Sequence, residues 1–245
     1  MKDIIGSAVL DYFHGNYSED IYTETNISEE DVLPLPYLFR SYTEMPALEQ
    51  KALQLAQGHV LDVGCGAGSH GLYLQKKGLK VTAIDTSQGA VTVAKERGLQ
   101  QVKMVGILDF SEEKFDTLLL LMNGTGIFQK LTYVSKYLTH LKTLLQPDGQ
   151  ILIDSSDLRY MYDTSETDSN GDEGIWVPGA MEYYGELEFT MRYKGASSEP
   201  FYWLYLDEQT FQNYCTENGY HFEVISRGEN YDYLARLTVA EYTPY

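Results

Sequence analysis

The chain has 245 residues, a formal net charge of -18 at pH 7 and two cysteines, Cys65 and Cys215, which lie far apart in the sequence. Such an acidic surface repels phosphate backbones and anionic membranes, and the lysines and arginines form no basic stripe, so neither nucleic acid nor a membrane is an expected partner. The longest apolar run, residues 118–122, is too short to span a bilayer. No Cys/His spacing indicates a metal site and no signal-like segment opens the chain, so we expect a cytoplasmic protein without a metal.

The N-terminal region predicts a cap outside the main domain. Residues 3–14 have the apolar spacing of an amphipathic helix. The acidic stretch 16–31 has few apolar anchors and predicts a mobile connection, and the prolines of residues 33–40 predict extended chain. We therefore expect residues 1–45 to form a cap or lid on a core that spans residues 46–245.

From residue 46 onward the pattern alternates between strands and helices, as in a doubly wound α/β sheet with parallel strands. Strands are expected at 59–63, 80–84, 101–105, 115–121 and 150–153, and helices between them at 68–77, 87–97 and 132–145. The alternation stops over about 155–206, where segments 181–193 and 201–206 predict an inserted β-hairpin. It resumes with a helix at 207–218 and strands at 222–225 and 233–242.

The most informative stretch is VLDVGCGAG, residues 60–68, in which three glycines alternate after an apolar strand. Glycine permits the tight turn and the close approach of backbone to a ligand. A second strand, 80–84, ends at Asp85, where an acid is placed to accept hydrogen bonds from ribose hydroxyls. The dinucleotide fingerprint G-x-G-x-x-G fits less well, because its third glycine position holds Ser69.

This sequence resembles the first motif of the class I S-adenosylmethionine (SAM) dependent methyltransferases. The resemblance covers about residues 47–154 and 207–242, and the N-terminal segment and the hairpin lie outside it. It implies a seven-stranded, mostly parallel sheet with one antiparallel strand, completed by the last helix and two strands. The cofactor implied is S-adenosyl-L-methionine.

The resemblance also implies roles for single residues. Asp62 and the glycine loop would hold the amino-acid end of SAM, Asp85 the ribose, and Asp109 the adenine amino group, with the backbone N–H of Phe110 meeting the ring. Thr86 lines the adenosine pocket or caps the next helix with Ser87, and we favour the cap for Ser87. The expected cofactor-binding residues are Asp62, Gly64, Cys65, Gly66, Gly68, Asp85, Thr86, Asp109, Phe110, Met122 and Asn123.

The acceptor site is harder to predict, because methyl transfer needs alignment more than acid–base help, and no catalytic residue is assigned. Tyr37 and Arg40 are candidates for gripping a carboxylate of SAM or substrate, and His70 for touching cofactor or substrate. Most of the insert's aromatic residues are expected on the buried face of a hairpin; they are Tyr160, Tyr162, Trp176, Tyr183, Tyr184, Tyr202, Trp203 and Tyr205. The acidic run 163–173 fails the calcium-loop spacing.

Two further observations bear on the substrate. Residues 123–126 read Asn-Gly-Thr-Gly, whereas amino-methylating nucleic-acid enzymes of the class often carry Asn/Asp-Pro-Pro-aromatic there. Together with the acidic charge, this favours methyl transfer to a small molecule. The alternatives are a SAM-fold binding or regulatory protein without turnover and, disfavoured by the glycine spacing, a NAD-dependent oxidoreductase. The oligomeric state stays open.

Overall fold

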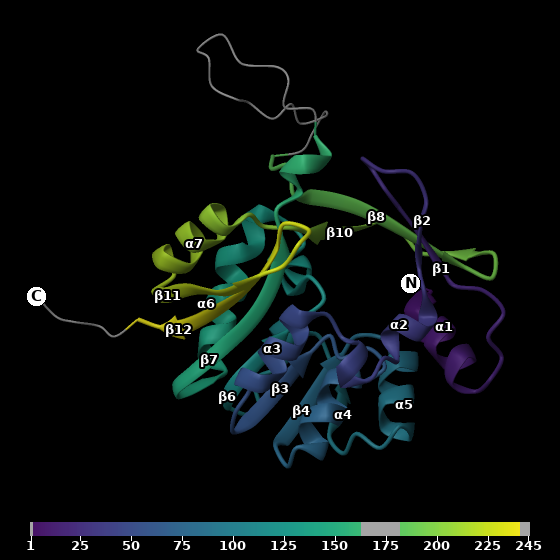
Figure 1. Ribbon diagram of the computed structural model, residues 1–245, viewed down its shortest axis with the longest axis horizontal. Helices are drawn as coiled ribbons and strands as arrows, with labels where there is room; N and C mark the ends of the chain where they lie inside the picture. The colour runs from purple at the N-terminus through teal and green to yellow at the C-terminus, as the bar shows by residue number, and fades with distance from the viewer. Residues whose placement is uncertain (1, 163–181, 241–245) are drawn as a thin grey trace, which may run out of the picture.

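The structure is a computed structural model that describes residues 2–162 and 182–240 (Figure 1). The start of the predicted strand at 181, Trp176 and the acidic run 163–173 lie outside the described residues, as do the last residues of the strand predicted at 233–242.

A seven-stranded sheet forms the centre of the molecule, with the strand order β11-β12-β7-β6-β3-β4-β5. Its parallel strands along the chain are β3 (His59–Val63), β4 (Lys80–Asp85), β5 (Val102–Met104), β6 (Phe115–Leu120) and β7 (Leu145–Ser156). β12 (Asp232–Val239) lies antiparallel between β7 and β11 (Tyr220–Arg227). The doubly wound sheet with one antiparallel strand is therefore confirmed.

Helices cover both faces of this sheet because its central strands are apolar on both sides. On one face α3 (Ala47–Leu55), α4 (Ser69–Lys76) and α5 (Gln88–Glu96) pack against Val60, Val81 and Leu119. On the other face α6 (Val134–Thr143) and α7 (Glu208–Glu217) pack against Leu61 and Leu118. Alternate residues of one strand thus enter opposite cores, as the pleat requires.

A second sheet joins the N-terminal segment to the insert, in the order β10-β8-β1-β2. The predicted hairpin is present as β8 (Glu186–Tyr193) and β10 (Phe201–Leu204), with the short β9 (Ala196–Ser197) beside β8. β1 (Ile21–Thr25) pairs with β8, and β2 (Asp31–Leu33) pairs with β1. In Figure 1 this sheet arches from the end of β7 across to α1 and α2.

The N-terminal segment contains two kinds of element that were not predicted from the sequence. Residues 16–31 contain β1 and the start of β2; β1 pairs with β2 on one side and with the distant β8 on the other. Residues 33–40 include a helical turn, α2 (Leu35–Leu38), since Pro36 stands in its first turn, where its missing N–H is not needed.

The first helix, α1 (Ile4–Phe13), is docked on α5 through a shared cap. The Asp3 carboxylate accepts the N–H of Gly6 at 2.8 Å in α1, and the Ser87 hydroxyl at 2.9 Å and the Gly89 N–H at 3.0 Å at the start of α5. A Cβ on Gly89 would lie 2.4 Å from Gly6 Cα, so two glycines allow the helices to touch. The division at residue 45 stays a prediction, and strands from both sides of it share one sheet.

Candidate functional site

The glycine loop leaves β3 in a conformation that only glycine adopts easily. Gly64 and Gly66 have φ values of +70° and +51°, and a Cβ built on either meets nothing within 4 Å. The N–H groups of Gly64 and Cys65 both donate to the Ile84 carbonyl, at 2.9 and 3.1 Å. The loop is therefore fixed to β4 on one side and borders open space on the other, as a cradle for a ligand.

The third glycine and Asp62 hold the helix that follows the loop. Gly68 precedes α4 at φ +85°, where a Cβ would lie 3.2 Å from the Ala94 Cβ of α5. Asp62 is buried at the end of β3 and accepts the Gly71 N–H at 3.0 Å. Burial raises the pKa of Asp62, with a smaller contribution from the Asp85 charge. The Asp62 carboxylate thus lies beneath the loop, against the first turn of α4.

Asp85 lies at the carboxyl end of β4, across the loop from Asp62. One of its oxygens accepts the Gly66 N–H and the other accepts the Ser87 N–H, both at 2.8 Å. Burial raises the pKa of Asp85. Thr86 is exposed, whereas the Ser87 hydroxyl accepts the Ala90 N–H at 3.0 Å, which confirms the predicted cap of α5.

Asp109 belongs to the turn η2 (Ile107–Asp109), next to the loop after β4. A Cβ on Gly106 would lie 3.6 Å from Asp109 Oδ2 and 3.8 Å from Thr86 Cγ2, so the exposed Asp109 carboxylate and Thr86 border one space. The Phe110 ring is buried in the core, and its N–H donates to the Ile107 carbonyl at 3.2 Å. That bond competes with the expected use of this N–H for adenine.

The chain leaves β6 through two residues in the left-handed region, Met122 (φ 67°) and Asn123 (φ 59°). Asp154, at the end of β7, holds this turn, because its carboxylate accepts the Met122 N–H at 3.1 Å and the Gly124 N–H at 2.8 Å. Burial raises the pKa of Asp154 to about 6. Sequence reasoning missed Asp154, although an acid at the end of a parallel strand was an available signal.

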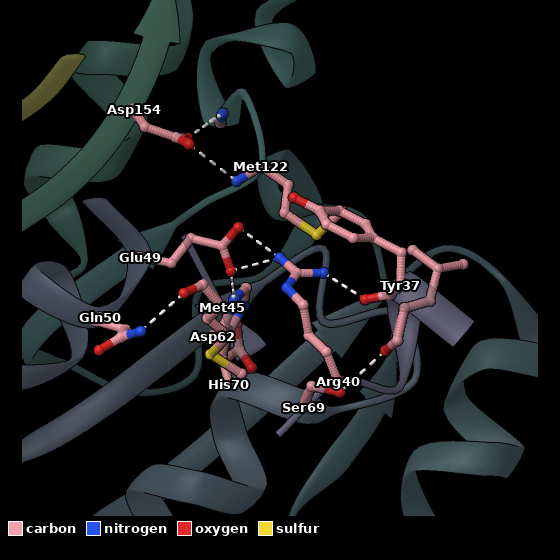
Figure 2. A network of polar contacts seen from close by, with 12 residues as sticks. Tyr37, Arg40, Met45, Glu49, Gln50, Asp62, Ser69, His70, Met122 and Asp154 are labelled. Carbon is pink, nitrogen blue, oxygen red and sulfur yellow. Dashed lines mark hydrogen bonds and ion pairs between the residues drawn. The ribbon is translucent and has the colours of Figure 1, made fainter. Parts of the chain in front are cut away.

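The two predicted residues of this turn face different surroundings. The Asn123 amide donates to the Leu204 carbonyl at 3.2 Å, and its oxygen accepts the Ser155 hydroxyl at 3.3 Å, so its side chain ties β6 to the insert. The Met122 side chain points toward the Tyr37 ring in Figure 2. Met122 is therefore the member of the pair that borders the N-terminal segment.

The three candidates for the acceptor site, Tyr37, Arg40 and His70, converge on Glu49 of α3 (Figure 2). The Arg40 guanidinium donates to both oxygens of Glu49 and to the Tyr37 carbonyl, and it stacks on the Tyr37 ring with 3.8 Å from Cζ to the ring centre. His70 Nε2 lies 2.6 Å from Glu49 Oε2. Arg40, Glu49 and His70 are buried, at 7, 4 and 8 % exposed, whereas Tyr37 is exposed.

The charges of this cluster compensate one another. Burial by itself would raise the pKa of Glu49, but the bonds and charges of His70 and Arg40 outweigh it and lower that pKa. Within the described ranges, Arg40 Nε is a buried donor without an acceptor. Glu49 was missed because a glutamate on a short amphipathic helix is usually on the solvent face, and nothing local distinguishes this one.

The chain is similar to a known structure over almost its whole length. The crystal structure of a SAM-dependent methyltransferase from Bacteroides fragilis, in complex with S-adenosyl-L-homocysteine, is 43% identical, with a TM-score of 0.88 over 98% of this chain and 96% of that one. The chain belongs to the class I SAM-dependent methyltransferase family. A family model described as a methyltransferase domain matches residues 61–153 of this methyltransferase, from β3 into β7.

Two further relatives are more distant from this methyltransferase. A curated protein of Geobacillus sp. strain WCH70, named as a methyltransferase, is 27% identical over 152 residues, which are 54% of this chain and 60% of that protein. The amino pentose methyltransferase CalS10 of Micromonospora echinaspora has a TM-score of 0.57 at 12% identity, over 84% of this chain and 94% of that one. The latter likeness shows the fold alone.

The cofactor of the family, SAM, fits the residues present. Gly64 and Gly66 leave room where any side chain would project, and Asp85 stands beside that room with a free lone pair on each oxygen. Within residues 2–162 and 182–240, no group of three or more His, Cys, Asp or Glu side chains is arranged to hold a metal ion. Over the same residues, no helix has the length and apolar character needed to cross a membrane.

Proposed function

We propose that this methyltransferase transfers the methyl group of SAM to a small-molecule acceptor in the cytoplasm. The observation that carries the proposal is the open cradle over Gly64 and Gly66, bordered by the Asp85 carboxylate. A small acceptor is supported by the net charge of -18, which repels nucleic acid. A reducing compartment is supported by Cys65 and Cys215, both free and buried.

The cofactor would lie along the carboxyl ends of β3, β4 and β5. Asp85 would accept the ribose hydroxyls, since each of its oxygens already holds one backbone N–H and retains a second lone pair. Asp109 and Thr86 would border the adenine. The amino-acid end would be held by the loop and by Asp62; the loop residues are Gly64, Cys65, Gly66 and Gly68. The backbone of three further residues would line the cofactor beside the reacting centre; these are Phe110, Met122 and Asn123.

Bound SAM supplies a methyl group on a positively charged sulfur, which is displaced in line. The chain's own contribution is alignment and the exclusion of water. We infer that Tyr37, Arg40 and His70 form the wall of the acceptor site nearest the cofactor. Arg40 and His70 are buried and fixed by their contacts with Glu49, which keeps the wall rigid. The exposed Tyr37 ring would be the part of the wall that contacts the acceptor.

The proposal is tested with the purified protein, methyl-labelled SAM and a small-metabolite extract freed of macromolecules. Transfer of label to a metabolite, with release of S-adenosyl-L-homocysteine, is expected. Calorimetry with S-adenosyl-L-homocysteine should show at least micromolar affinity, on the order of -8 kcal/mol. Binding of NAD in its place would contradict the proposal, and cofactor binding with no labelled product from any extract would favour a regulatory SAM-binding protein.

A further inference from the structure

One face of the second sheet carries a row of aromatic side chains. Phe201 of β10 pairs directly with Phe189 of β8, and Trp203 follows two residues later on β10, so the pleat places all three on the same face. The ring centres of Phe189 and Phe201 are 6.0 Å apart and nearly parallel, and those of Phe201 and Trp203 are 6.4 Å apart and perpendicular. We call these three residues the aromatic roof.

The two ends of this sheet face are fixed to different parts of the core. At one end Ile21 and Tyr193 pack with Leu35 of α2, and the Leu38 carbonyl at the end of α2 accepts the Ser69 hydroxyl at the start of α4. At the other end, Trp203 packs against Gly126, where a Cβ would lie 1.9 Å from the ring.

Gly126 belongs to η3 (Gly124–Phe128), the turn that follows β6. The sheet face that carries the aromatic roof therefore extends from α2, which contacts the start of α4, to the turn after β6. This is the edge of the main sheet where the reacting centre lies. All three roof residues are only half-buried, although aromatic side chains of this size are normally covered in a folded protein. Phe189 packs in part against Leu158, Tyr184 and Leu187, and each of the three rings keeps part of its surface accessible.

A carboxylate stands at the same turn. Asp154 is bonded to the N–H of Gly124, two residues before the glycine on which Trp203 rests. The backbone N–H groups of Met122, Asn123 and Gly124 all approach this carboxylate, so of the four lone-pair positions on its two oxygens one remains. Asp154 is half-buried, whereas the other carboxylate in this region, Glu49, is buried and paired with Arg40 and His70. Of these two carboxylates, Asp154 is therefore the one that can accept a further hydrogen bond from a ligand.

We propose that the methyl acceptor is an amine on an apolar or aromatic body, held by the aromatic roof and paired through its ammonium group with Asp154. This rests on the proposed function and names its substrate class. Aromatic faces attract cations as well as apolar groups, so the roof favours a cationic ligand over an anionic one. A carboxylate with a free lone pair distinguishes an ammonium from an anion, which it repels.

The chemistry balances without another reactant. The acceptor ammonium gives one proton to an Asp154 oxygen and becomes a neutral amine with a free lone pair. That lone pair forms the new carbon–nitrogen bond as the carbon–sulfur bond breaks, with its electrons remaining on sulfur. Asp154 then releases the proton to water. The raised pKa of Asp154 makes its carboxylate a stronger base than an ordinary aspartate, which assists the first step.

The test uses a matched pair of probes, 2-phenylethylamine and 2-phenylethanol, added to the full-length protein saturated with S-adenosyl-L-homocysteine. Binding is measured by titration calorimetry or saturation-transfer NMR. The amine should bind about tenfold more tightly than the alcohol at about pH 7.5, because only the amine forms a charged pair. Equal binding of the two probes, or tighter binding of the alcohol, would overturn the inference.

Variants test the contributions of Asp154 and of the aromatic roof to amine binding separately. Asp154→Asn should remove the preference for the amine, and Asp148→Asn, in an exposed turn, serves as its control. Phe201→Leu should weaken the binding of 2-phenylethylamine about fivefold or more, because the ring face that attracts the ligand is lost. Tyr202→Leu, which changes the opposite face of the same strand, should not. Retained preference in Asp154→Asn, or identical effects of Phe201→Leu and Tyr202→Leu, would contradict the assignment.

The wild-type protein provides a measurement that needs no variant. Lowering the pH from about 7.5 to about 5 should shrink the amine preference as Asp154 gains a proton. The groups facing Asp154 are Glu49, His70, Tyr37 and Tyr205, and Glu49 keeps its charge in this range because its pKa is lowered. A preference that does not change with pH would overturn the role of Asp154. Failure of S-adenosyl-L-homocysteine to bind would instead contradict the proposed function itself.

Discussion

Glu49 and His70 stand on different helices and are joined by a 2.6 Å contact between Oε2 and Nε2. The same carboxylate binds the Arg40 guanidinium, which comes from the N-terminal segment. One glutamate therefore connects that segment to the first turn of α4, directly after the glycine loop. Docking of the segment and the shape of the loop are coupled through this contact.

Glu49→Gln should be strongly destabilising, because it leaves the Arg40 charge buried without a counter-ion. The expected loss in the free energy of unfolding is about 3–5 kcal/mol at neutral pH, measured by urea denaturation. Glu44→Gln, which affects an exposed capping carboxylate, should cost about 1 kcal/mol or less. Equal losses in the two variants would show that the buried cluster contributes little.

The stability of the protein should depend on pH through Asp154. Its pKa is about 6 in the folded state against an ordinary value of 3.8, so the folded state binds the proton more tightly. The stabilising contribution is complete below about pH 4 and is lost as the pH rises to about 6. Across this window wild type should lose about 2 kcal/mol relative to Asp154→Asn in urea denaturation. A constant difference would contradict the raised pKa.

Glu49 should act in the opposite direction. Its lowered pKa means that its contribution is present at neutral pH and is lost as the pH falls through that lowered value. The two groups therefore titrate in different windows, and Glu49→Gln should reduce the loss of stability that urea denaturation measures as the pH falls below the ordinary glutamate pKa of 4.5.

A comparison of Gly64→Ala with Gly15→Ala tests whether the glycine loop binds the cofactor. Gly15 has nearly the same φ, +78° against +70°, and a Cβ on either meets nothing within 4 Å. Both alanine variants should lose about 1–2 kcal/mol of stability from left-handed strain. Only Gly64→Ala should also weaken the binding of S-adenosyl-L-homocysteine, because the methyl group of the new alanine projects into the space above the loop. Calorimetry showing equal affinities for the two variants would place the ligand elsewhere.

Asp85→Ala should weaken the binding free energy of S-adenosyl-L-homocysteine by about 1.5–3 kcal/mol, the range for hydrogen bonds to a charged group. The Gly66 N–H also loses its acceptor, so a small loss of stability should accompany the weaker binding. Calorimetry gives the affinity, and thermal unfolding shows that the variant stays folded. An unchanged dissociation constant would mean that another residue accepts the ribose hydroxyls.

The N-terminal segment should resist protease while it is docked. Asp3→Ala removes the shared cap of α1 and α5 and should cost about 1–2 kcal/mol. Limited proteolysis within residues 14–20 should then be faster than in wild type, and S-adenosyl-L-homocysteine should slow it in both proteins by favouring the closed segment. Cleavage rates that do not respond to ligand would show that the segment is a fixed extension of the core.

The main sheet was predictable because its signals are local. Gly58, Gly78 and Gly98 each follow a helix at positive φ, and each precedes the next strand closely. One boundary was missed: β7 begins at Leu145 rather than at residue 150, because residues 146–149, with Asp148 at φ 64°, form a bulge between the pairs Phe115–Leu145 and Thr117–Gln150.

The N-terminal strands β1 and β2 and the site residues Glu49 and Asp154 were not predicted from local pattern. β1 has five residues and lies between β2 and β8, with Tyr22 opposite Val32 on one side and Arg192 on the other, so half of its pairing comes from a strand that no short window contains. Glu49 and Asp154 are ordinary acids in sequence, and only the approach of Arg40, His70 and the turn after β6 gives them a role.

The pairing of β1 with β8 also sets an order of assembly during synthesis. Tyr22 of β1 lies opposite Arg192 of β8, so the N-terminal strand must wait for most of the chain before it can form this pairing. The glycine loop and its neighbouring acids are complete long before that point. During synthesis the glycine loop is thus present well before the strands that carry the aromatic roof, and a chain shortened before β8 would have the loop without the roof.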